Sequence, residues 1–206
     1  MRWSISLAIL SLASCVQSPV APEPLLAGVE AREPAEPESR QRHRLSVRLG
    51  ARSLDLEEIW DPVAEQFTAG LEYSQVSASG FGLEFGLNGS VGFEEGGDAD
   101  FDVTGGILEG YGGLRKEFDW GRWRPSFGVG AAWIAAGIDN DAAGSLADDS
   151  DTSIGYYAHG GLLYDCSSST FIGVDVRVLR GSEIEFDGLE GDADYEQITL
   201  VLGLRF

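Results

Sequence analysis

The carboxy-terminal segment from Tyr195 to Phe206 alternates between apolar residues and small or polar ones. Its first set, at every second position, is Ile198, Leu200, Leu202, Leu204 and Phe206. Its second set is Gln197, Thr199, Val201, Gly203 and Arg205. A period of two places successive side chains on opposite faces of a β-strand. The segment therefore predicts a strand with one apolar face that ends on an aromatic residue.

Seven earlier segments alternate in the same way, at about 45–52, 66–76, 81–93, 107–118, 124–134, 154–164 and 170–179. Their lengths suit tilted membrane strands, which need about 9–11 residues. The connections are long at 53–65, 94–106, 135–153 and 180–194 and short at 77–80, 119–123 and 165–169. Alternate connections of an antiparallel meander lie at the same end. The pattern predicts an all-β fold, an eight-stranded antiparallel up-and-down transmembrane β-barrel over residues 42–206.

The amino-terminal residues have the composition of an export signal followed by a linker. An apolar stretch from Trp3 to Ala13 is too short to span a bilayer, so residues 1–14 are predicted to be a signal peptide. The residues Leu12-Ala13-Ser14-Cys15 resemble the lipobox of bacterial lipoproteins, which implies lipidation of Cys15. The alternative is an ordinary signal peptide with a cysteine near its cut site. Residues 15–41 are rich in proline and are predicted to form a disordered tether.

The segment 45–206 resembles the small eight-stranded outer-membrane barrels of the OmpA and OmpX type. The resemblance rests on the terminal strand with Phe206, on Tyr156-Tyr157 with Gly160-Gly161, and on the run Gly173 to Arg177. It implies an outer-membrane location with a periplasmic amino terminus and extracellular long loops. It also implies contact with outer-membrane lipid and lipopolysaccharide. By the same resemblance, Phe206 is the assembly signal that the barrel-assembly machinery reads.

A soluble barrel is the competing fold. A lipoprotein-anchored, lipocalin-like ligand carrier would turn its apolar face inward and its polar face to water. Such a polar face normally carries many Lys and Glu, whereas here it is dominated by Gly, Ser and Thr. Aromatic residues also gather near strand ends, as Trp120 and Trp123 do, which is typical of a membrane interface. These features favour the membrane barrel.

The polar face of the predicted strands carries charge. An eight-stranded barrel is just filled by side chains, so an open pore is not expected. Acidic and basic residues on the inward face are nearly balanced, and an unpaired buried charge is costly. The pattern predicts a paired lumen network of Arg48, Arg52, Glu72, Glu84, Glu109, Arg115, His159, Asp175, Arg177 and Arg205.

Two parts of this network resemble catalytic constellations. The 77–80 turn brings Glu72 near Glu84, which suits either an acid–base pair or two carboxylates with Arg48 or Arg115 between them. The 165–169 turn brings His159 near Asp175. Lipid A deacylases of the outer membrane need a serine two residues after their histidine, and Gly161 stands there. The sequence therefore predicts a non-enzymatic protein without catalytic residues or cofactors, and a lipid-modifying barrel enzyme stays the alternative.

The chain is strongly acidic, with 34 Asp+Glu against 14 Lys+Arg and a formal net charge of -20. This charge argues against nucleic acid as a partner, because phosphates require a basic surface. The long connections are rich in carboxylates and, apart from Arg180, contain no Lys or Arg. They predict a solvated, repulsive rim or adhesion to a basic partner. A third alternative is weak Ca²⁺ binding by Asp139, Asp141, Asp148, Asp149 and Asp151, since Ca²⁺ prefers oxygen ligands.

A short basic cluster of Arg40, Arg42, His43 and Arg44 precedes the first strand. It predicts either contact with lipid phosphates at the barrel's inner-leaflet boundary or a solvated linker end. The second cysteine, Cys166, has no predicted intrachain partner once Cys15 is lipidated or removed. The sequence leaves its role open, together with the oligomeric state and any specific ligand.

Overall fold

A computed structural model describes residues 41–55, 63–94, 103–140, 150–186 and 189–206. The predicted signal peptide, Cys15 and residues 15–40 of the predicted tether lie outside these ranges. Within them, no helix is long and apolar enough to cross a membrane. The strands are β1 (Arg42–Leu54), β2 (Glu65–Val76), β3 (Phe81–Glu94), β4 (Val103–Glu117), β5 (Trp123–Asn140), β6 (Ser150–Asp165), β7 (Thr170–Arg180), β8 (Glu183–Phe186), β9 (Leu189–Asp192) and β10 (Tyr195–Arg205).

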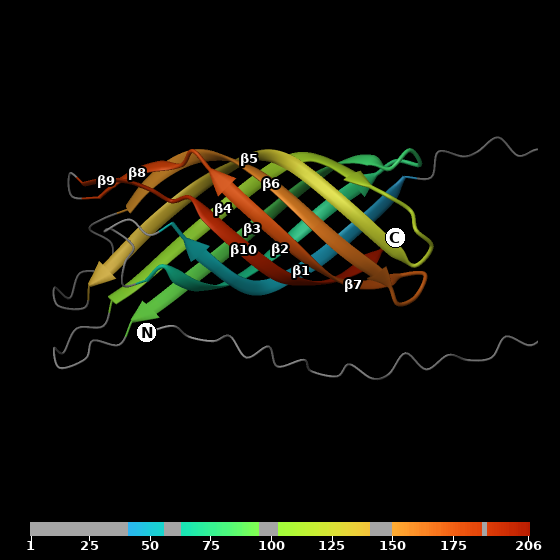
Figure 1. Ribbon diagram of the computed structural model, residues 1–206, viewed down its shortest axis with the longest axis horizontal. Coiled ribbons are helices and arrows are strands. Elements are labelled where there is room, and N and C mark those ends of the chain that lie inside the picture. Colours follow the sequence, from blue (N-terminus) through green and yellow to red (C-terminus); the bar gives the residue numbers. More distant parts are fainter. Residues whose placement is uncertain (1–40, 56–62, 95–102, 141–149, 187–188) are drawn as a thin grey trace, which may run out of the picture. The chain divides into compact units, whose positions relative to one another are not determined.

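The strands close into a barrel in the order β1-β10-β7-β6-β5-β4-β3-β2, and β8 and β9 form a separate hairpin (Figure 1). Every pairing is antiparallel. The last strand closes the barrel on the first, with Leu45 opposite Leu204 and Ala51 opposite Ile198. Closure satisfies the backbone groups that an open sheet edge would leave exposed to lipid. The predicted eight-stranded antiparallel barrel is confirmed.

The two faces of the wall differ as the alternation predicts. Along β1, Leu45, Val47 and Leu49 are exposed, whereas Ser46 and Arg48 are buried. Other strands repeat this pattern, and Leu87 on β3 is 63% exposed. A membrane barrel needs an apolar outer band because lipid offers polar side chains no hydrogen-bond partners. The lipocalin-like alternative, with apolar side chains inside, does not match this wall.

The strands extend further toward the long connections than the sequence pattern predicted. β4 begins at Val103, β5 continues to Asn140, and the connection 180–194 contains the β8–β9 hairpin. In these extensions backbone pairing continues although the residues no longer alternate clearly between apolar and polar. Glycines such as Gly105 and Gly106 also weaken the strand signal there. The long-loop end therefore has more regular structure than predicted.

The opposite, short-turn end holds the connections 77–80, 118–122 and 166–169. In the first turn Gly80 donates to the carbonyl of Ser77 at 2.9 Å and has a φ of 82°. A Cβ at Gly80 would lie 2.3 Å from the carbonyl oxygen of Glu117, so a side chain is excluded there. The carbonyl of Gly80 in turn accepts from the Glu117 amide at 2.8 Å. This glycine therefore docks the first turn on β4.

The carboxy-terminal residue is tied to β1 at the short-turn end. The Phe206 amide donates to the His43 carbonyl at 3.0 Å, and the His43 amide donates to the Phe206 carbonyl at 3.2 Å. The two rings stack with centroids 5.9 Å apart. His43 Nδ1 also lies 2.7 Å from the hydroxyl of Tyr73 on β2. Phe206 thus takes part in the seam at which the barrel closes.

Candidate functional site in the barrel lumen

Inward-facing side chains fill the barrel lumen with charge. Because alternate residues of a strand share a face, buried residues from all eight barrel strands point into one enclosed space. The charged residues and tyrosines of its middle are called the lumen network below. They are Arg48, Arg52, Glu72, Glu84, Glu109, Tyr111, Arg115, Tyr157, His159, Asp175, Arg177 and Tyr195.

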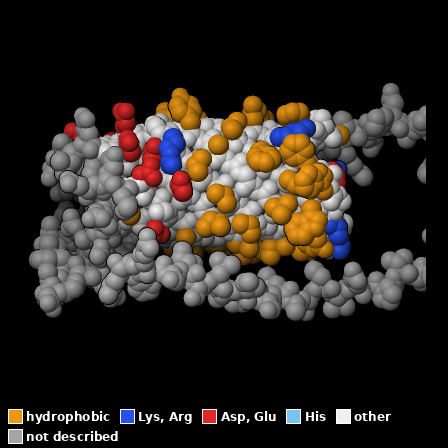
Figure 2. Space-filling view, in the orientation of Figure 1, with side chains coloured by type: hydrophobic (Ala, Val, Ile, Leu, Met, Phe, Trp, Pro, Cys, Tyr) orange, Lys and Arg blue, Asp and Glu red, His pale blue; other side chains and the backbone are white. Residues whose placement is uncertain are grey.

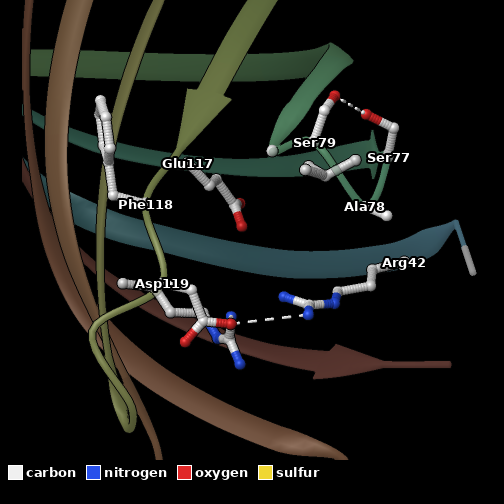
Figure 3. Close-up of a pocket in the computed structure, with 10 residues that line it drawn as sticks. Arg42, Ser77, Ala78, Ser79, Glu117, Phe118 and Asp119 are labelled. Atoms are coloured by element: carbon white, nitrogen blue, oxygen red, sulfur yellow. Dashed lines mark hydrogen bonds and ion pairs between the residues drawn. The ribbon is translucent and has the colours of Figure 1, made fainter.

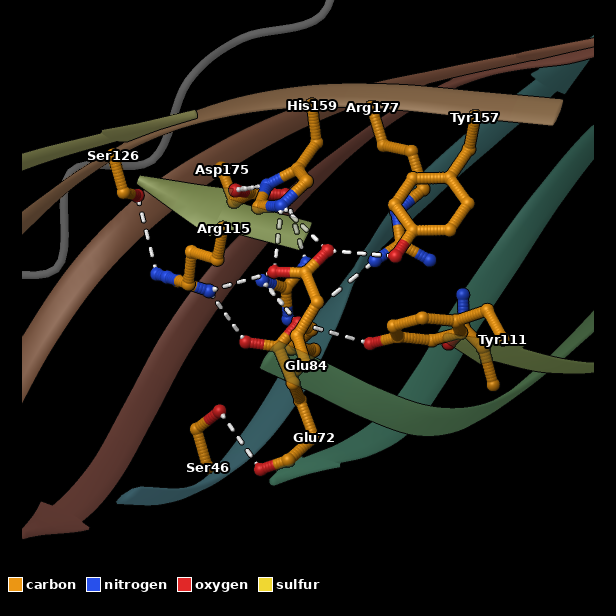
Figure 4. A network of polar contacts seen from close by, with 12 residues as sticks. Ser46, Glu72, Glu84, Tyr111, Arg115, Ser126, Tyr157, His159, Asp175 and Arg177 are labelled. Atoms are coloured by element: carbon orange, nitrogen blue, oxygen red, sulfur yellow. Dashed lines mark hydrogen bonds and ion pairs between the residues drawn. The ribbon is translucent and has the colours of Figure 1, made fainter. Parts of the chain in front are cut away.

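Arg115 lies between the carboxylates of Glu72 and Glu84 (Figure 4). Its Nη1 is 2.7 Å from Glu72 Oε1 and 3.3 Å from Glu84 Oε2. Its Nη2 donates to Ser126 Oγ at 3.1 Å. Glu84 stands opposite Ser74 in the register, so the two carboxylates approach diagonally rather than directly. A cation between them relieves their repulsion, which is the ion-pair alternative rather than the acid–base pair.

His159 bridges two carboxylates. Its Nδ1 lies 2.6 Å from Asp175 Oδ2, and its Nε2 lies 2.9 Å from Glu84 Oε1. Only a protonated imidazole carries N–H groups on both ring nitrogens, so the geometry suits an imidazolium. A Cβ at Gly128 would lie 2.1 Å from His159 Nε2, and glycine alone leaves room for the ring. The Tyr157 hydroxyl donates to Glu84 Oε1 at 2.7 Å and completes this corner.

Arg48 links the two acidic corners of the network. Its Nη2 is 2.7 Å from Glu72 Oε2, and its Nη1 is 2.8 Å from Asp175 Oδ1. The Tyr111 hydroxyl donates to Glu72 Oε2 at 3.0 Å. Glu72 therefore pairs with two arginines and accepts hydrogen bonds from Arg115 and Tyr111. Buried charges remain tolerable when each is paired and hydrogen-bonded in this way.

Glu109 forms a second centre closer to the long-loop end. It lies 2.6 Å from Arg52 Nη2 and 3.1 Å from Arg177 Nη1, and it accepts from the Tyr195 hydroxyl at 2.7 Å. The Arg177 guanidinium also lies 3.8 Å from the ring centroid of Tyr111. Planar guanidinium groups bind carboxylates and stack on aromatic rings at the same time. The arginine–tyrosine contacts therefore join this centre to the rest of the network.

Beyond Glu109 most buried lumen side chains are apolar, with the hydrogen-bonded pair Gln66 and Ser90 beside them. This apolar plug is defined by its buried residues Leu54, Val63, Ala64, Ile107, Ile134, Ala136, Leu179, Ile184 and Ala193. The backbone holds it together, because the Leu54 amide donates to the Ala64 carbonyl at 2.9 Å. The hairpin strand β8 contributes Ile184. The lumen is thus closed by packed side chains on one side of the ion pairs.

At the short-turn end the ion pairs surround a small polar cavity of about 110 Å³ (Figure 3). Arg42 pairs with Asp119 across its edge at 3.6 Å, and Arg124 Nη1 reaches the same carboxylate at 3.0 Å. The slight burial of Asp119 raises the pKa of its carboxyl, but the hydrogen bond and charge of Arg124 outweigh it and lower that pKa. Glu117 lines the cavity and its Oε2 is buried without a hydrogen-bond partner. The cavity is large enough for water at this position.

Comparisons with known proteins agree with this geometry. The model of the family described as "Outer membrane protein beta-barrel domain" matches residues 24–206. The chain belongs to that family. No curated protein sequence matches it. This outer-membrane barrel therefore carries its apolar outer wall in lipid and its lumen network inside.

Solved structures of outer-membrane barrels share the fold. OprG from Pseudomonas aeruginosa is 14% identical with a TM-score of 0.56, and the match covers 82% of this chain and 97% of OprG. The attachment invasion locus protein Ail of Yersinia pestis is 12% identical with a TM-score of 0.51, covering 82% of this chain and 99% of Ail. Neisserial surface protein A is 14% identical with a TM-score of 0.50, covering 81% and 97%. At such identities the likeness concerns the fold alone.

Several lumen residues were absent from the sequence prediction. Arg44, predicted to lie in a basic cluster that either contacts lipid phosphates or ends a solvated linker, is 2% exposed and pairs with Glu117 inside the barrel, so both alternatives are wrong for Arg44. Tyr111, Tyr157 and Tyr195 were also missed. All share the inward parity of their strands, which was the available signal. The sequence did not mark these tyrosines as lumen residues, because tyrosine also occurs on the lipid-facing side at membrane interfaces.

One predicted network residue lies apart from the others. Arg205 pairs with Asp165 at the short-turn end, and Asp165 Oδ2 also lies 2.6 Å from Arg124 Nε. Among the described residues, Arg205 forms no ion pair with Glu72, Glu84 or Asp175. The inward parity of Arg205 was predicted, but its height along the barrel depends on where β10 ends.

The structure describes only some of the residues predicted to bind metal or carry lipid. Cys15, Asp141, Asp148 and Asp149 lie outside the described residues, and for Asp139 only its place in β5 is described. Asp151 Oδ2 accepts from the Glu185 amide at 2.8 Å, and its Oδ1 accepts from the Thr152 amide at 2.7 Å. In the described part of the chain, no group of three or more His, Cys, Asp or Glu is arranged to hold a metal ion.

Proposed function

We propose that this protein is a non-enzymatic outer-membrane barrel with a filled lumen, which presents an acidic rim on the cell surface. The observation that carries the proposal is the way the lumen is filled. The lumen network occupies its middle and the apolar plug lies on the long-loop side. Hydrophilic solutes need a continuous wet path, and packed apolar side chains interrupt it. Structural support of the envelope and interaction at the surface are the roles that remain.

A conductance measurement tests the filled lumen. Purified protein inserted into planar bilayers is expected to give no stepwise current in symmetric salt. An Ile134→Gly/Leu179→Gly double variant, which removes two plug side chains that are 0% exposed, serves as a comparison for a loosened plug. Steady single-channel steps from the unaltered protein would overturn the proposal of a closed barrel.

An enzymatic role in lipid modification is the competing proposal, and His159 is its natural candidate. The side chain of His159 is 0% exposed and both ring nitrogens face carboxylates. A general base must reach a substrate proton directly or through one water. We therefore expect His159→Asn to leave the lipid A composition of producing cells unchanged. A shift in lipid A acylation that follows His159→Asn but not Arg180→Gln would favour the enzyme.

We propose an orientation with the short turns in the periplasm and the long connections outside the cell. The rule of short periplasmic turns and longer external loops in such barrels supports it. Among described residues, the carboxylates of the external end include Asp55, Glu65, Glu183, Glu185 and Glu196. Arg180 is the cation that pairs there, with Asp55 at 3.6 Å and Glu196 at 3.2 Å. Surface labelling of intact cells at single cysteines placed at Ser79 and at Ser53 distinguishes the two ends.

The acidic rim is proposed to work through divalent cations or basic partners. Carboxylates near the phosphates of lipopolysaccharide repel them unless cations lie between. Millimolar Ca²⁺ is expected to raise the melting temperature in detergent by more than Na⁺ of equal ionic strength. An equal effect of the two salts would mean general screening and remove the proposal of cation bridging.

Phe206 is proposed to act as the assembly signal read by the barrel-assembly machinery. Its deletion removes the two backbone hydrogen bonds to His43, worth about 1–2 kcal/mol together. We expect the truncated chain to accumulate poorly in the outer membrane of cells, yet to refold in detergent with only that modest loss of stability. Normal accumulation in cells would contradict the assignment. His43→Ala, which weakens the same seam without altering the terminus, is the matched control.

The lipid-anchored tether is likewise a proposal. It rests on the lipobox-like residues around Cys15 and on the proline-rich segment that follows. Mass spectrometry of the mature protein is expected to show an acylated Cys15, and Cys15→Ser should remove the added mass. A mature chain that lacks Cys15 would instead support the ordinary signal peptide.

A further inference from the structure

Two cations of the described residues stand out because no carboxylate lies within 4.0 Å of them. These are Lys116 and Arg122. The remaining described arginines each have an acidic partner, and they are Arg42, Arg44, Arg48, Arg52, Arg115, Arg124, Arg177, Arg180 and Arg205. In a chain with a net charge of -20, cations without a carboxylate are unexpected. Both belong to the short-turn end, one near the end of β4 and the other in the turn that follows.

Lys116 projects from the outer wall among aromatic rings. Its register neighbours are Phe81 on β3 and Phe127 on β5, both exposed. Its ammonium group lies 3.9 Å from the centroid of the Phe81 ring and 5.6 Å from that of Phe118. It donates one hydrogen bond, to the carbonyl of Ser79 at 2.7 Å. An ammonium group has three donors, so further donors remain for a ligand.

Arg122 lies in the turn between β4 and β5 and has a similar arrangement. Its guanidinium lies 5.7 Å from the centroid of the Tyr164 ring, and Nη1 donates to the Tyr164 hydroxyl at 3.2 Å. Tyr164 in turn packs on Trp123, with ring centroids 4.8 Å apart. A guanidinium has five N–H donors, and most of those of Arg122 remain available. Both cations therefore stand on aromatic supports with hydrogen-bonding capacity unused.

The surroundings of the two cations are those of a lipid interface. Trp120 is 69% exposed and Phe127 is 61% exposed at the same end of the wall. Figure 2 shows orange side chains gathered toward this end of the visible face with blue ones beside them, while red ones gather toward the other end. Aromatic side chains favour the level of the headgroups. A long cationic side chain at that level directs its head toward the headgroups.

We propose that Lys116 and Arg122 each bind the phosphodiester headgroup of an anionic phospholipid, with phosphatidylglycerol as the probe. The two lipid contacts lie on opposite flanks of the β4–β5 hairpin, Lys116 toward β3 and Arg122 toward β6. Phosphate oxygens accept from the free ammonium and guanidinium donors, while the exposed rings lie beside the upper acyl chains. The site rests on the proposed orientation, which places this end in the phospholipid leaflet. Arg44 of the predicted basic cluster takes no part in lipid binding, since it pairs with Glu117 inside the lumen.

Native mass spectrometry of the full chain, released from mild detergent with defined added lipids, tests the site. The variants are Lys116→Gln, Arg122→Gln and the double change. Arg180→Gln is the matched control, because Arg180 is also an exposed cation on the wall but lies at the other end. Each single variant is expected to weaken phosphatidylglycerol binding about fivefold at its own position and to leave the other position unchanged, and the double variant to weaken both positions. Arg180→Gln and the charge-keeping Lys116→Arg should bind as the unaltered protein does.

Three outcomes would overturn the site. Equal weakening by Arg180→Gln would mean that overall charge, and not this hairpin, governs binding. Equal binding of zwitterionic phosphatidylethanolamine would mean that the anionic headgroup is not recognised. Tighter binding of lipopolysaccharide, or competition by free inorganic phosphate at equal concentration, would assign the two cations to a different ligand.

The experiment separates this site from the proposed orientation. Native mass spectrometry does not depend on how the barrel sits in a cell, so the binding result stands by itself. Surface labelling at Ser79 reports the orientation independently. Labelling of the short-turn end in intact cells would overturn the orientation and, with it, the proposal of a phospholipid-leaflet site, even if the purified protein binds phosphatidylglycerol. Heat-modifiable gel migration confirms that each variant is folded before its lipid binding is compared.

Discussion

The two halves of the lumen are filled by opposite kinds of side chain within the same wall. Around Arg115 and His159 the interior consists of paired charges, whereas around Ile134 and Leu179 it is packed with apolar groups. Both halves are buried, so burial alone does not select apolar residues. In the polar half each charge needs an oppositely charged partner. In the apolar half the side chains need to fill the available space. The two halves should therefore respond differently to the same kind of substitution.

The difference matters for what the protein can do. Ion pairs in a narrow lumen restrict the arrangement of the wall, because the planar guanidinium donates its N–H groups in fixed directions. An apolar plug gives less specificity but keeps water out. Having both, the barrel carries paired charges in its middle and packed apolar side chains toward its long-loop end. A wide water-filled lumen would need neither feature.

Removing one network cation should give the largest loss of stability. Arg115→Met leaves the carboxylates of Glu72 and Glu84 without the cation between them, which is expected to cost about 3–5 kcal/mol. Urea unfolding in detergent, followed by tryptophan fluorescence, measures the loss. Arg180→Met at the exposed wall should cost less than about 1 kcal/mol. Similar losses for the two variants would mean that the lumen charges are not a coupled network.

A second change sharpens that test. Adding Glu72→Gln to Arg115→Met removes one of the two carboxylates that Arg115 separated, so part of the lost stability should return if their repulsion outweighs the remaining pair of Glu72 with Arg48. If the double variant is less stable than Arg115→Met alone, hydrogen bonding by Glu72 outweighs its charge. The balance of charges would then not be what organises the polar half.

A cavity in the apolar plug should have the next largest effect. Ile134→Ala leaves an unfilled space in a packed cluster and is expected to cost about 2–4 kcal/mol. Ile154→Ala removes the same atoms from the lipid-facing wall, where lipid fills the space, and should cost clearly less. The same unfolding measurement compares them. Equal losses would show that the plug is loosely packed and that the sealed half is not as described.

The ion pairs of the short-turn end should be weaker than those of the network. Asp165 lies 2.6 Å from Arg124 Nε and also pairs with Arg205, but both pairs are partly open to water. Asp165→Asn is therefore expected to cost about 1–2 kcal/mol, between the values for exposed and buried pairs. A loss as large as that of Arg115→Met would place the boundary of the buried network at this end of the barrel.

The smallest effect concerns pH. The pKa of Asp119 is lowered in the folded protein, chiefly by Arg124 acting against a slight desolvation. A depressed carboxyl pKa contributes stability that is present above the unfolded value near 3.8 and is lost as the pH falls through the folded value. Because Asp119 is exposed, the contribution should be within about 1 kcal/mol. Between pH 6 and pH 3 the unaltered protein should lose slightly more melting temperature than Asp119→Asn. An equal loss would show that the Arg124 contact does not stabilise the carboxylate.

The sequence predicted more of the fold than of the site. Period-two alternation identified the eight barrel strands and the inward parity of residues such as Glu84 and Asp175, because parity is a local property of a strand. The sequence did not identify the β8–β9 hairpin, whose short strands lie beyond the apolar band. It also placed Arg44 in a basic cluster outside the lumen. Parity placed Arg205 inward but could not give its height, which depends on the stagger between strands.

The sequence by itself determined the alternation, the order of long and short connections and the imbalance of charge between loops and turns. From these the barrel follows, since only a closed sheet satisfies its backbone in lipid. The tertiary structure decided which charges meet. His159 joins Asp175 to Glu84, residues 16 and 75 positions away along the chain, because closure of the wall brings β3, β6 and β7 around one narrow space. Which side chains pair across a lumen depends on both strand stagger and side-chain length. The alternation pattern of a single strand does not give the stagger between strands.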